Sequence, residues 1–175
     1  MDGSKCISYL TIEHRGEVEQ GLHAAMGDWL FGCDVCQEVC PHNSARSVSA
    51  AMPELRVGHQ PPQPGDWGTA APRELEVEEG AAVQPAYAVR RTGFSLLEVL
   101  RWSEDDRREA FKTSPMKRAP LGTMKRNALI AAGNSLVEKP DAELKARIEE
   151  LAVDTGESAT IRQTAAAVLA ALAKG

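Results

Sequence analysis

The last part of the chain repeats apolar and small residues at the spacing of α-helices. Between residues 124 and 136 these residues recur at intervals of three and four, which places them on one helix face. A second segment has Leu144, Ile148 and Leu151 at the same spacing, and it follows Asp141, a residue type that caps a first helical turn. The pattern therefore predicts two helices here, separated by Pro140.

Two shorter helices are predicted just before them. Ser103 followed by Asp106 has the form of a capping box, and acidic residues in a first turn are favoured by the helix dipole. We expect a helix from residue 104 to about 112. The apolar residues between Phe94 and Leu100 predict another short helix, with Trp102 packing at the junction.

A weak internal repeat links two of the helical segments. Residues 125 to 132 align with residues 161 to 168, so that Arg126 and Arg162 each precede a helix of small residues. The offset is close to the period of roughly 40 residues in helical-pair repeats of the HEAT or armadillo kind. The repeat favours a HEAT-like domain, and an ordinary Ala-rich bundle stays open as the alternative.

Proline and glycine interrupt the helical pattern between residues 46 and 92, most clearly in the stretch 59–68. The sequence thus predicts three parts: an iron–sulfur segment at 1–45 that contains every cysteine, a Pro/Gly-rich connector at 46–92, and a helical domain at 93–175. The expected fold class is mainly α, α+β overall, with a partial ferredoxin-like segment followed by HEAT-like helical repeats.

Composition is that of a globular protein, with 43% hydrophobic and 26% charged residues. A net charge of −5 argues against wholesale wrapping of nucleic acid, although a local basic patch can coexist with it. No stretch approaches the ~20 apolar residues that span a bilayer, and the N-terminus has no apolar leader. We therefore expect a cytoplasmic protein without a membrane partner.

The four cysteines carry the strongest chemical signal. Cys33, Cys36 and Cys40, followed by Pro41, spell CxxCxxxCP, and Cys6 is the remaining one. The bacterial ferredoxin run is CxxCxxCxxxCP, in which the fourth cysteine ligates a second cluster. The position of its first cysteine is occupied here by a leucine, so Cys6 is the only candidate to replace that ligand.

An iron–sulfur cluster suits these thiols better than the other possibilities. Structural zinc sites usually pair two CxxC-like hooks, and this chain has one. Two disulfides are disfavoured because a tight cysteine group in a chain without a leader more often binds metal. Zinc and buried free thiols stay open as alternatives, and we expect His42 to lie at the surface or beside the ligands rather than to act as a further ligand.

Two stretches around these cysteines closely resemble epoxyqueuosine reductase: KCISYLTIE at residues 5–13 and GDWLFGCDVCQEVCPHN at residues 27–43. The resemblance is strong over the first 45 residues. It continues weakly through Trp102, 107–111, 114–118 and 125–128, where the family has a HEAT-like region.

The resemblance implies an oxidoreductase that reduces an epoxide in a modified tRNA base, in the last step of queuosine synthesis, with cobalamin and two [4Fe–4S] clusters. It implies that Cys6, Cys33 and Cys36 ligate one cluster and that Cys40 ligates the other.

In the intact family an earlier cysteine motif and the cobalamin pocket precede this region, and the sequence has neither. We therefore expect the C-terminal portion of such an enzyme, inactive alone and without catalytic residues of its own. A separate N-terminal half is a possible partner. Ser8 and Asp34, beside the ligands, are the candidates to approach the corrin, although local hydrogen bonding explains both more simply.

A basic run is the second functional clue. Residues 111 to 137 contain five cations and no acid: Lys112, Lys117, Arg118, Lys125 and Arg126. Such a run can neutralise phosphates, which predicts salt-dependent tRNA binding. The simpler alternative is a solvated face, because Lys and Arg are usually exposed.

Two other functions are compatible with the sequence. The chain could hold one cluster with its own four cysteines and act as a stand-alone electron-transfer protein. It could instead be an adaptor that binds tRNA or protein.

Overall fold

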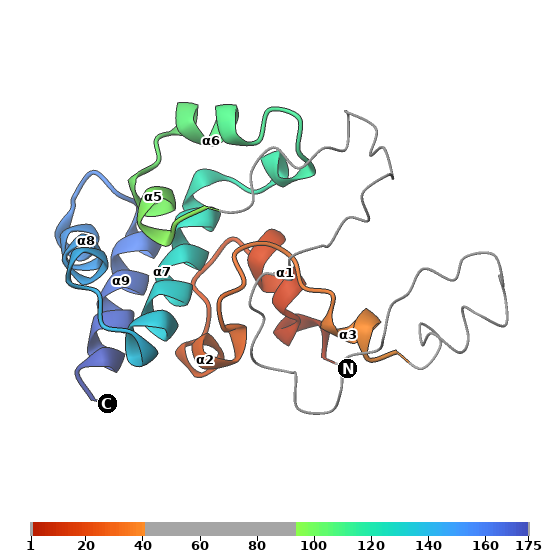
Figure 1. Cartoon of the computed structure of the whole chain (residues 1–175), viewed down its shortest axis with the longest axis horizontal. Coiled ribbons are helices and arrows are strands. Elements are labelled where there is room, and N and C mark those ends of the chain that lie inside the picture. The colour runs from red at the N-terminus through yellow and green to blue at the C-terminus, as the bar shows by residue number, and fades with distance from the viewer. Residues whose placement is uncertain (1, 41–93, 175) are drawn as a thin grey trace, which may run out of the picture. The chain divides into compact units, whose positions relative to one another are not determined.

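The computed structural model describes residues 2–40 and 94–174, in which every regular element is a helix and no strand occurs (Figure 1). The elements, in chain order, are η1 (Gly3–Lys5), α1 (Ile7–Ile12), η2 (Gln20–Leu22), α2 (His23–Met26), α3 (Val35–Glu38), α5 (Leu96–Arg101), α6 (Glu104–Ala110), η6 (Pro115–Arg118), α7 (Leu121–Glu138), α8 (Ala142–Val153) and α9 (Ala159–Leu172). The mainly α class is confirmed, whereas the β component of the expected α+β class is not seen in the described residues. The expected connector at 46–92 lies outside them, as does His42, for which a place at the surface or beside the ligands was expected. None of the described helices is both long and apolar enough to cross a membrane.

The chain divides into two compact units. The first joins residues 1–33 to residues 93–175, and the second covers residues 34–92. The described part of the second unit is residues 34–40, which include α3. The first unit therefore contains the N-terminal segment as well as the helical segments near the C-terminus.

Helix α7 is the centre of the first unit. It packs against α9, α5, α2 and α1, while α8 packs against α9 (Figure 1). Ala128, Leu129 and Ala132 of α7 are fully buried in the main apolar core, which also includes Ile148 of α8 and Ala165 of α9. The apolar residues whose spacing predicted these helices are therefore the ones that form the core.

Three aromatic rings close the core beside α5 and α6. Phe94, Trp102 and Phe111 meet edge to face, with ring centroids 5.0 to 5.5 Å apart. Edge-to-face pairs bring the positive ring edge onto the negative face of the neighbour. The predicted packing of Trp102 at the junction of the two helices is confirmed.

The predicted helix caps are also confirmed. Ser103 and Asp106 form a reciprocal capping box at the start of α6. Asp141 Oδ1 accepts a hydrogen bond from the Leu144 amide at 3.0 Å, at the start of α8. Helix α6 ends at Ala110 because Phe111 leaves the helical conformation and its side chain is buried.

The two aligned segments of the weak repeat lie in α7 and α9. Their arginines have different surroundings: Arg126 is 1% exposed, whereas Arg162 is partly exposed and donates to the Glu157 carbonyl. The HEAT-like arrangement stays a prediction.

A small residue brings α7 and α9 close together. A Cβ atom on Gly133 would lie 2.7 Å from Cγ1 of Val168, well inside van der Waals contact. Val168 is β-branched and has little rotamer freedom in a helix, so it cannot turn aside at low cost. The glycine therefore sets the separation of the two helices at this point.

We predict that Gly133→Ala destabilises the protein by about 1–3 kcal/mol, because overpacking outweighs the gain in helix propensity. Gly122→Ala is the matched control, since Gly122 also lies in α7 and has nothing within 4 Å of the added Cβ. Urea unfolding followed by circular dichroism measures both. Equal stability of the two variants would contradict the close packing.

Candidate metal centre

Two of the four cysteines lie in the first unit. Cys6 precedes α1 as its N-cap residue and is partly exposed, and its carbonyl accepts the Leu10 amide at 2.9 Å. Cys33 is partly exposed and directly follows Gly32, whose φ of +74° is unfavourable for residues with a side chain. Both cysteines are therefore partly accessible to solvent.

The other two cysteines belong to the second unit. Cys36 lies in α3 and is exposed, and Cys40 follows that helix and is partly exposed. All four thiols are free, so the structure contains neither of the two disulfides that four cysteines could form. Within residues 2–40 and 94–174, no three His, Cys, Asp or Glu side chains are gathered in a way that could hold a metal ion. The donor chemistry fits a cluster, because soft thiolates are the ligands that iron–sulfur clusters take.

A hydrogen-bond network holds the backbone just before Cys33. The Gly32 amide donates to Thr11 Oγ1 of α1 at 3.0 Å. Nδ2 of Asn127 in α7 donates to the Thr11 carbonyl at 2.9 Å and to the Leu30 carbonyl at 2.8 Å. Because Thr11 and Asn127 are both 0% exposed, water does not compete for these bonds.

Arg126 anchors the end of α1 from the same helix. Its Nη1 donates to the carbonyls of His14 and Gly16 at 2.8 and 2.7 Å, and its Nη2 donates to the Leu10 carbonyl. Burial, together with the nearby charge of Arg15, lowers the pKa of Arg126 from its ordinary value to about 10. The guanidinium therefore stays charged at neutral pH. It donates to the Leu10 carbonyl, which the end of α1 leaves without a partner in the helix, and to two carbonyls of the chain that follows α1.

A third α7 side chain fixes the next loop of the N-terminal segment. Asn134 Nδ2 donates to the His23 carbonyl at 2.8 Å and to the Gly27 carbonyl at 2.7 Å. Gly27, at the end of α2, has a φ of +56°. Burial lowers the pKa of His23, whose Nε2 lies 3.1 Å from the Val18 carbonyl oxygen.

The two residues expected beside the corrin make local contacts. Ser8 is partly exposed in α1, and its carbonyl accepts the Thr11 hydroxyl at 3.3 Å. Asp34 is exposed, and its Oδ1 accepts a hydrogen bond from Gln37 Nε2 at 3.0 Å. A role for either residue near a cofactor stays a prediction.

The five cations of the basic run are not on one face. Lys112, Lys117 and Arg118 are exposed, and the first and last of them pair with Glu109 and Glu13. Lys125 is buried and pairs with Glu157, and Arg126 is buried as described above. Only the first three side chains are therefore available to a nucleic acid.

Comparison with known proteins shows what the chain is similar to. Residues 1–43 match a family described as the 4Fe-4S double cluster binding domain. The epoxyqueuosine reductase of Cellulophaga algicola is 60% identical over 43 residues, which cover 25% of this chain and 14% of that enzyme. The epoxyqueuosine reductase of Alicycliphilus denitrificans is 30% identical over 174 residues, or 97% of this chain and 39% of the enzyme.

The chain is related to epoxyqueuosine reductase. The epoxyqueuosine reductase of Pseudomonas aeruginosa supports the same relationship, with 31% identity over 84% of this chain and 32% of that enzyme. The chain thus spans less than half the length of these relatives. No solved structure gives a significant match. The resemblance inferred from the cysteine motif is confirmed, as is the assignment of an iron–sulfur segment to the start of the chain.

The anchoring residues Asn127, Asn134 and Thr11 were not among the sites predicted from sequence. The available signal was the presence of polar residues at positions that helical spacing assigns to a buried face. Arg126 was assigned to tRNA binding because it follows another cation in a basic run. Its partners are backbone carbonyls, which no side-chain pattern can reveal.

We predict that Arg126→Met destabilises the protein by at least about 3 kcal/mol, because it leaves three carbonyls without their donor. Arg118→Met is the matched control: it also removes a contact with the N-terminal segment, but its partner Glu13 and Arg118 itself are exposed. Exposed ion pairs contribute about 0–1 kcal/mol. Thermal or urea unfolding distinguishes the two, and equal losses would contradict the anchoring role.

Proposed function

We propose that the chain forms the iron–sulfur region and supporting helical domain of an epoxyqueuosine reductase, which reduces epoxyqueuosine to queuosine in tRNA. The observation that carries the proposal is the CxxCxxxCP motif inside a segment that matches a double-cluster domain and is 60% identical to a curated epoxyqueuosine reductase. The weaker similarity over the remaining chain supports the same assignment for the helices.

The proposed ligands follow from the motif. Cys6, Cys33 and Cys36 would bind one [4Fe–4S] cluster, and Cys40, before Pro41, would bind a second. When bound, such clusters supply single electrons. Two clusters take eight thiolates if each is held by cysteines alone, and these 175 residues contain four. The complete reaction would therefore require ligands from outside them, and cobalamin stays a prediction from the family resemblance.

The helical domain has two proposed roles. The first is to hold the N-terminal segment through the side chains of α7, which is supported by the bonds of Arg126, Asn127 and Asn134. The second is to offer exposed cations to tRNA. The HEAT-like organisation and a cytoplasmic location belong to the same proposal.

Metal content tests the cluster assignment. We expect anaerobically purified protein to contain iron and acid-labile sulfide in equal amounts, with visible charge-transfer absorption, and we expect Cys33→Ser to lose most of both. Zinc without sulfide would contradict the proposal and favour a structural zinc site. An iron-loaded protein without affinity for tRNA would instead favour a stand-alone electron carrier.

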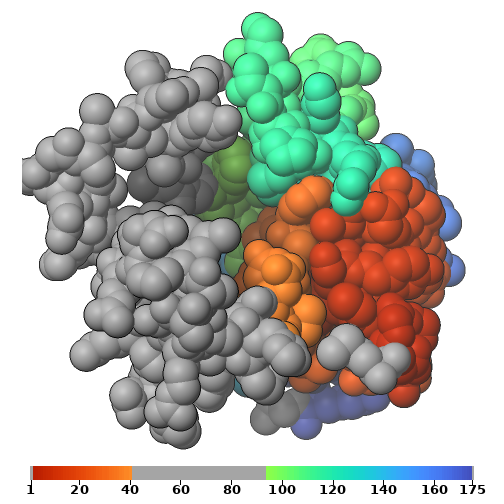
Figure 2. Space-filling view, turned by 90° about the vertical axis from the view of Figure 1, so that its right-hand side faces the viewer, coloured from red at the N-terminus to blue at the C-terminus, as the bar shows by residue number. Residues whose placement is uncertain are grey.

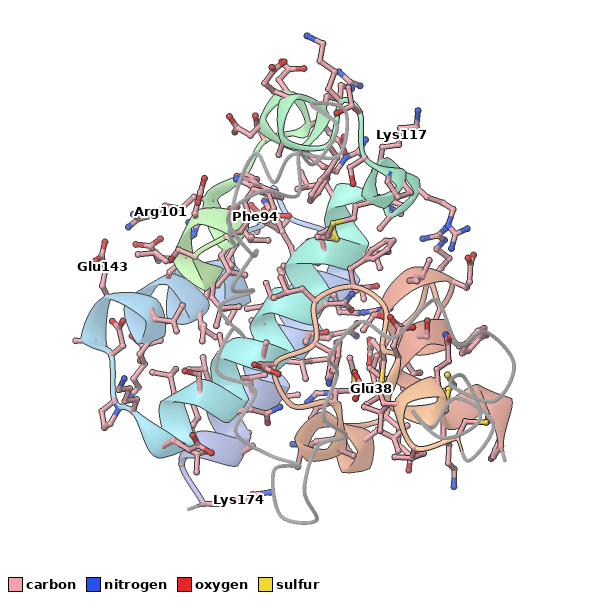
Figure 3. All side chains as sticks on the ribbon, turned by 45° about the vertical axis from the view of Figure 1, so that its right-hand side comes forward. Glu38, Phe94, Arg101, Lys117, Glu143 and Lys174 are labelled. Carbon is pink, nitrogen blue, oxygen red and sulfur yellow. The ribbon has the colours of Figure 1, made fainter. Side chains whose placement is uncertain are left out.

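The exposed cations provide a separate test. Lys117 points away from the body of the first unit in Figure 3. We predict that the triple reversal Lys112→Glu, Lys117→Glu and Arg118→Glu weakens tRNA binding and lowers the slope of log K against log salt by about one per lost phosphate contact.

The control for this experiment makes the same change in net charge at a different place. Lys139, Lys145 and Lys174 are exposed, and Lys174 lies far from Lys117 in Figure 3. Their reversal to Glu should affect binding only through the overall charge. Equal loss of tRNA binding in both triple variants would contradict a local site at the first three cations.

A further inference from the structure

Thr11 contacts the backbone that directly precedes Cys33. The Thr11 hydroxyl donates its single proton to the Ile7 carbonyl at 2.8 Å, with a longer contact of 3.3 Å to the Ser8 carbonyl. Bonding of this kind within a helix is common for threonine. As a result, the hydroxyl oxygen keeps its lone pairs free to accept a hydrogen bond from outside α1, and it accepts one from the Gly32 amide.

Asn127 secures the same loop from a second direction. Its two amide protons are divided between α1, at the Thr11 carbonyl, and the loop, at the Leu30 carbonyl. Its Oδ1 is occupied as well, because Arg126 donates to it from Nη2 at 2.8 Å and from Nε at 3.2 Å. The carboxamide therefore has one orientation that satisfies all of its partners.

The loop is also held by packing. Leu30 and Phe31 are partly buried against the main apolar core. A Cβ on Gly32 would meet nothing within 4 Å, so space does not require glycine there. The positive φ does require it, and that φ sets the direction in which the chain enters Cys33.

We propose that Thr11 and Asn127 are positioning residues for the metal centre, which hold the Cys33 backbone in a fixed relation to Cys6 at the other end of α1. The inference rests on the proposed function, since it requires that these two cysteines bind a cluster. Residues that orient metal ligands without touching the metal typically change metal affinity by 10–100-fold when they are altered.

The test compares Thr11→Val with Thr11→Ser in the full chain. Valine has the shape of threonine but cannot accept the Gly32 amide, whereas serine keeps the hydroxyl. We expect the valine variant to release iron to a chelator about tenfold faster than the unaltered chain and to shift the reduction potential of the bound cluster. The serine variant should keep both properties close to those of the unaltered chain.

Equal iron release and equal potential in the valine and serine variants would overturn the inference. If Thr11→Val also lowers the melting temperature of the metal-free chain, Gly32→Ala decides, because it strains the loop and leaves the contact between α1 and α7 intact. Iron release from this variant is compared with that from Gly133→Ala, which destabilises the same unit away from the loop. Faster release from Gly32→Ala than from Gly133→Ala supports the positioning role, and equal release overturns it.

The iron and sulfide content of the unaltered chain is measured first, which separates the two levels of the proposal. If that chain holds no iron, the proposed function fails and the inference fails with it. If it holds iron and the Thr11 and Gly32 variants release it equally slowly, only the positioning role fails.

Discussion

The burial of a charged guanidinium and a carboxamide on one helix, with a second, partly buried carboxamide two turns further on, is the constraint on which the rest of the first unit depends. A polar group removed from water is costly unless its donors find acceptors, and a charge is costlier still. Arg126, Asn127 and Asn134 meet this requirement only when the N-terminal segment lies against α7 with its carbonyls in place. The hydrogen bonds therefore select one docking position, where apolar contact alone would tolerate several.

The N-terminal segment needs this support because its own apolar content is small. Leu10, Val18 and Met26 are buried together with Ile130, which belongs to α7. Helices as short as α1 and α2 are not stable by themselves, since few residues repay the cost of the first turn. The segment that contains Cys6 and Cys33 is thus part of the same cooperative unit as the helical domain. In Figure 2 its red surface lies directly against the blue-green surface near η6, where Arg118 pairs with Glu13 at 3.2 Å.

Buried and exposed ion pairs contribute differently to the stability of this protein. Lys125 and Glu157 form an ion pair with side chains 7% and 18% exposed, which ties α7 to the turn before α9. Breaking such a pair from one side leaves an uncompensated buried charge. The exposed pairs of α6, such as Arg108 with Asp105, lie in water and contribute little to stability. A count of charges along the chain cannot separate these two cases.

The sequence by itself determined several helices of the C-terminal part and the iron–sulfur character of the cysteine motif, because both depend on residues close together in the chain. Helical spacing predicted α7 and α8, Ser103 and Asp141 predicted two helix starts, and the CxxCxxxCP spacing indicated an iron–sulfur segment. Only the tertiary structure decided what Thr11, Arg126 and Asn127 do. Their partners are backbone groups as far as 116 residues away in the chain, and every residue offers the same carbonyl. Which carbonyls meet which donors is settled only when α1 packs against α7.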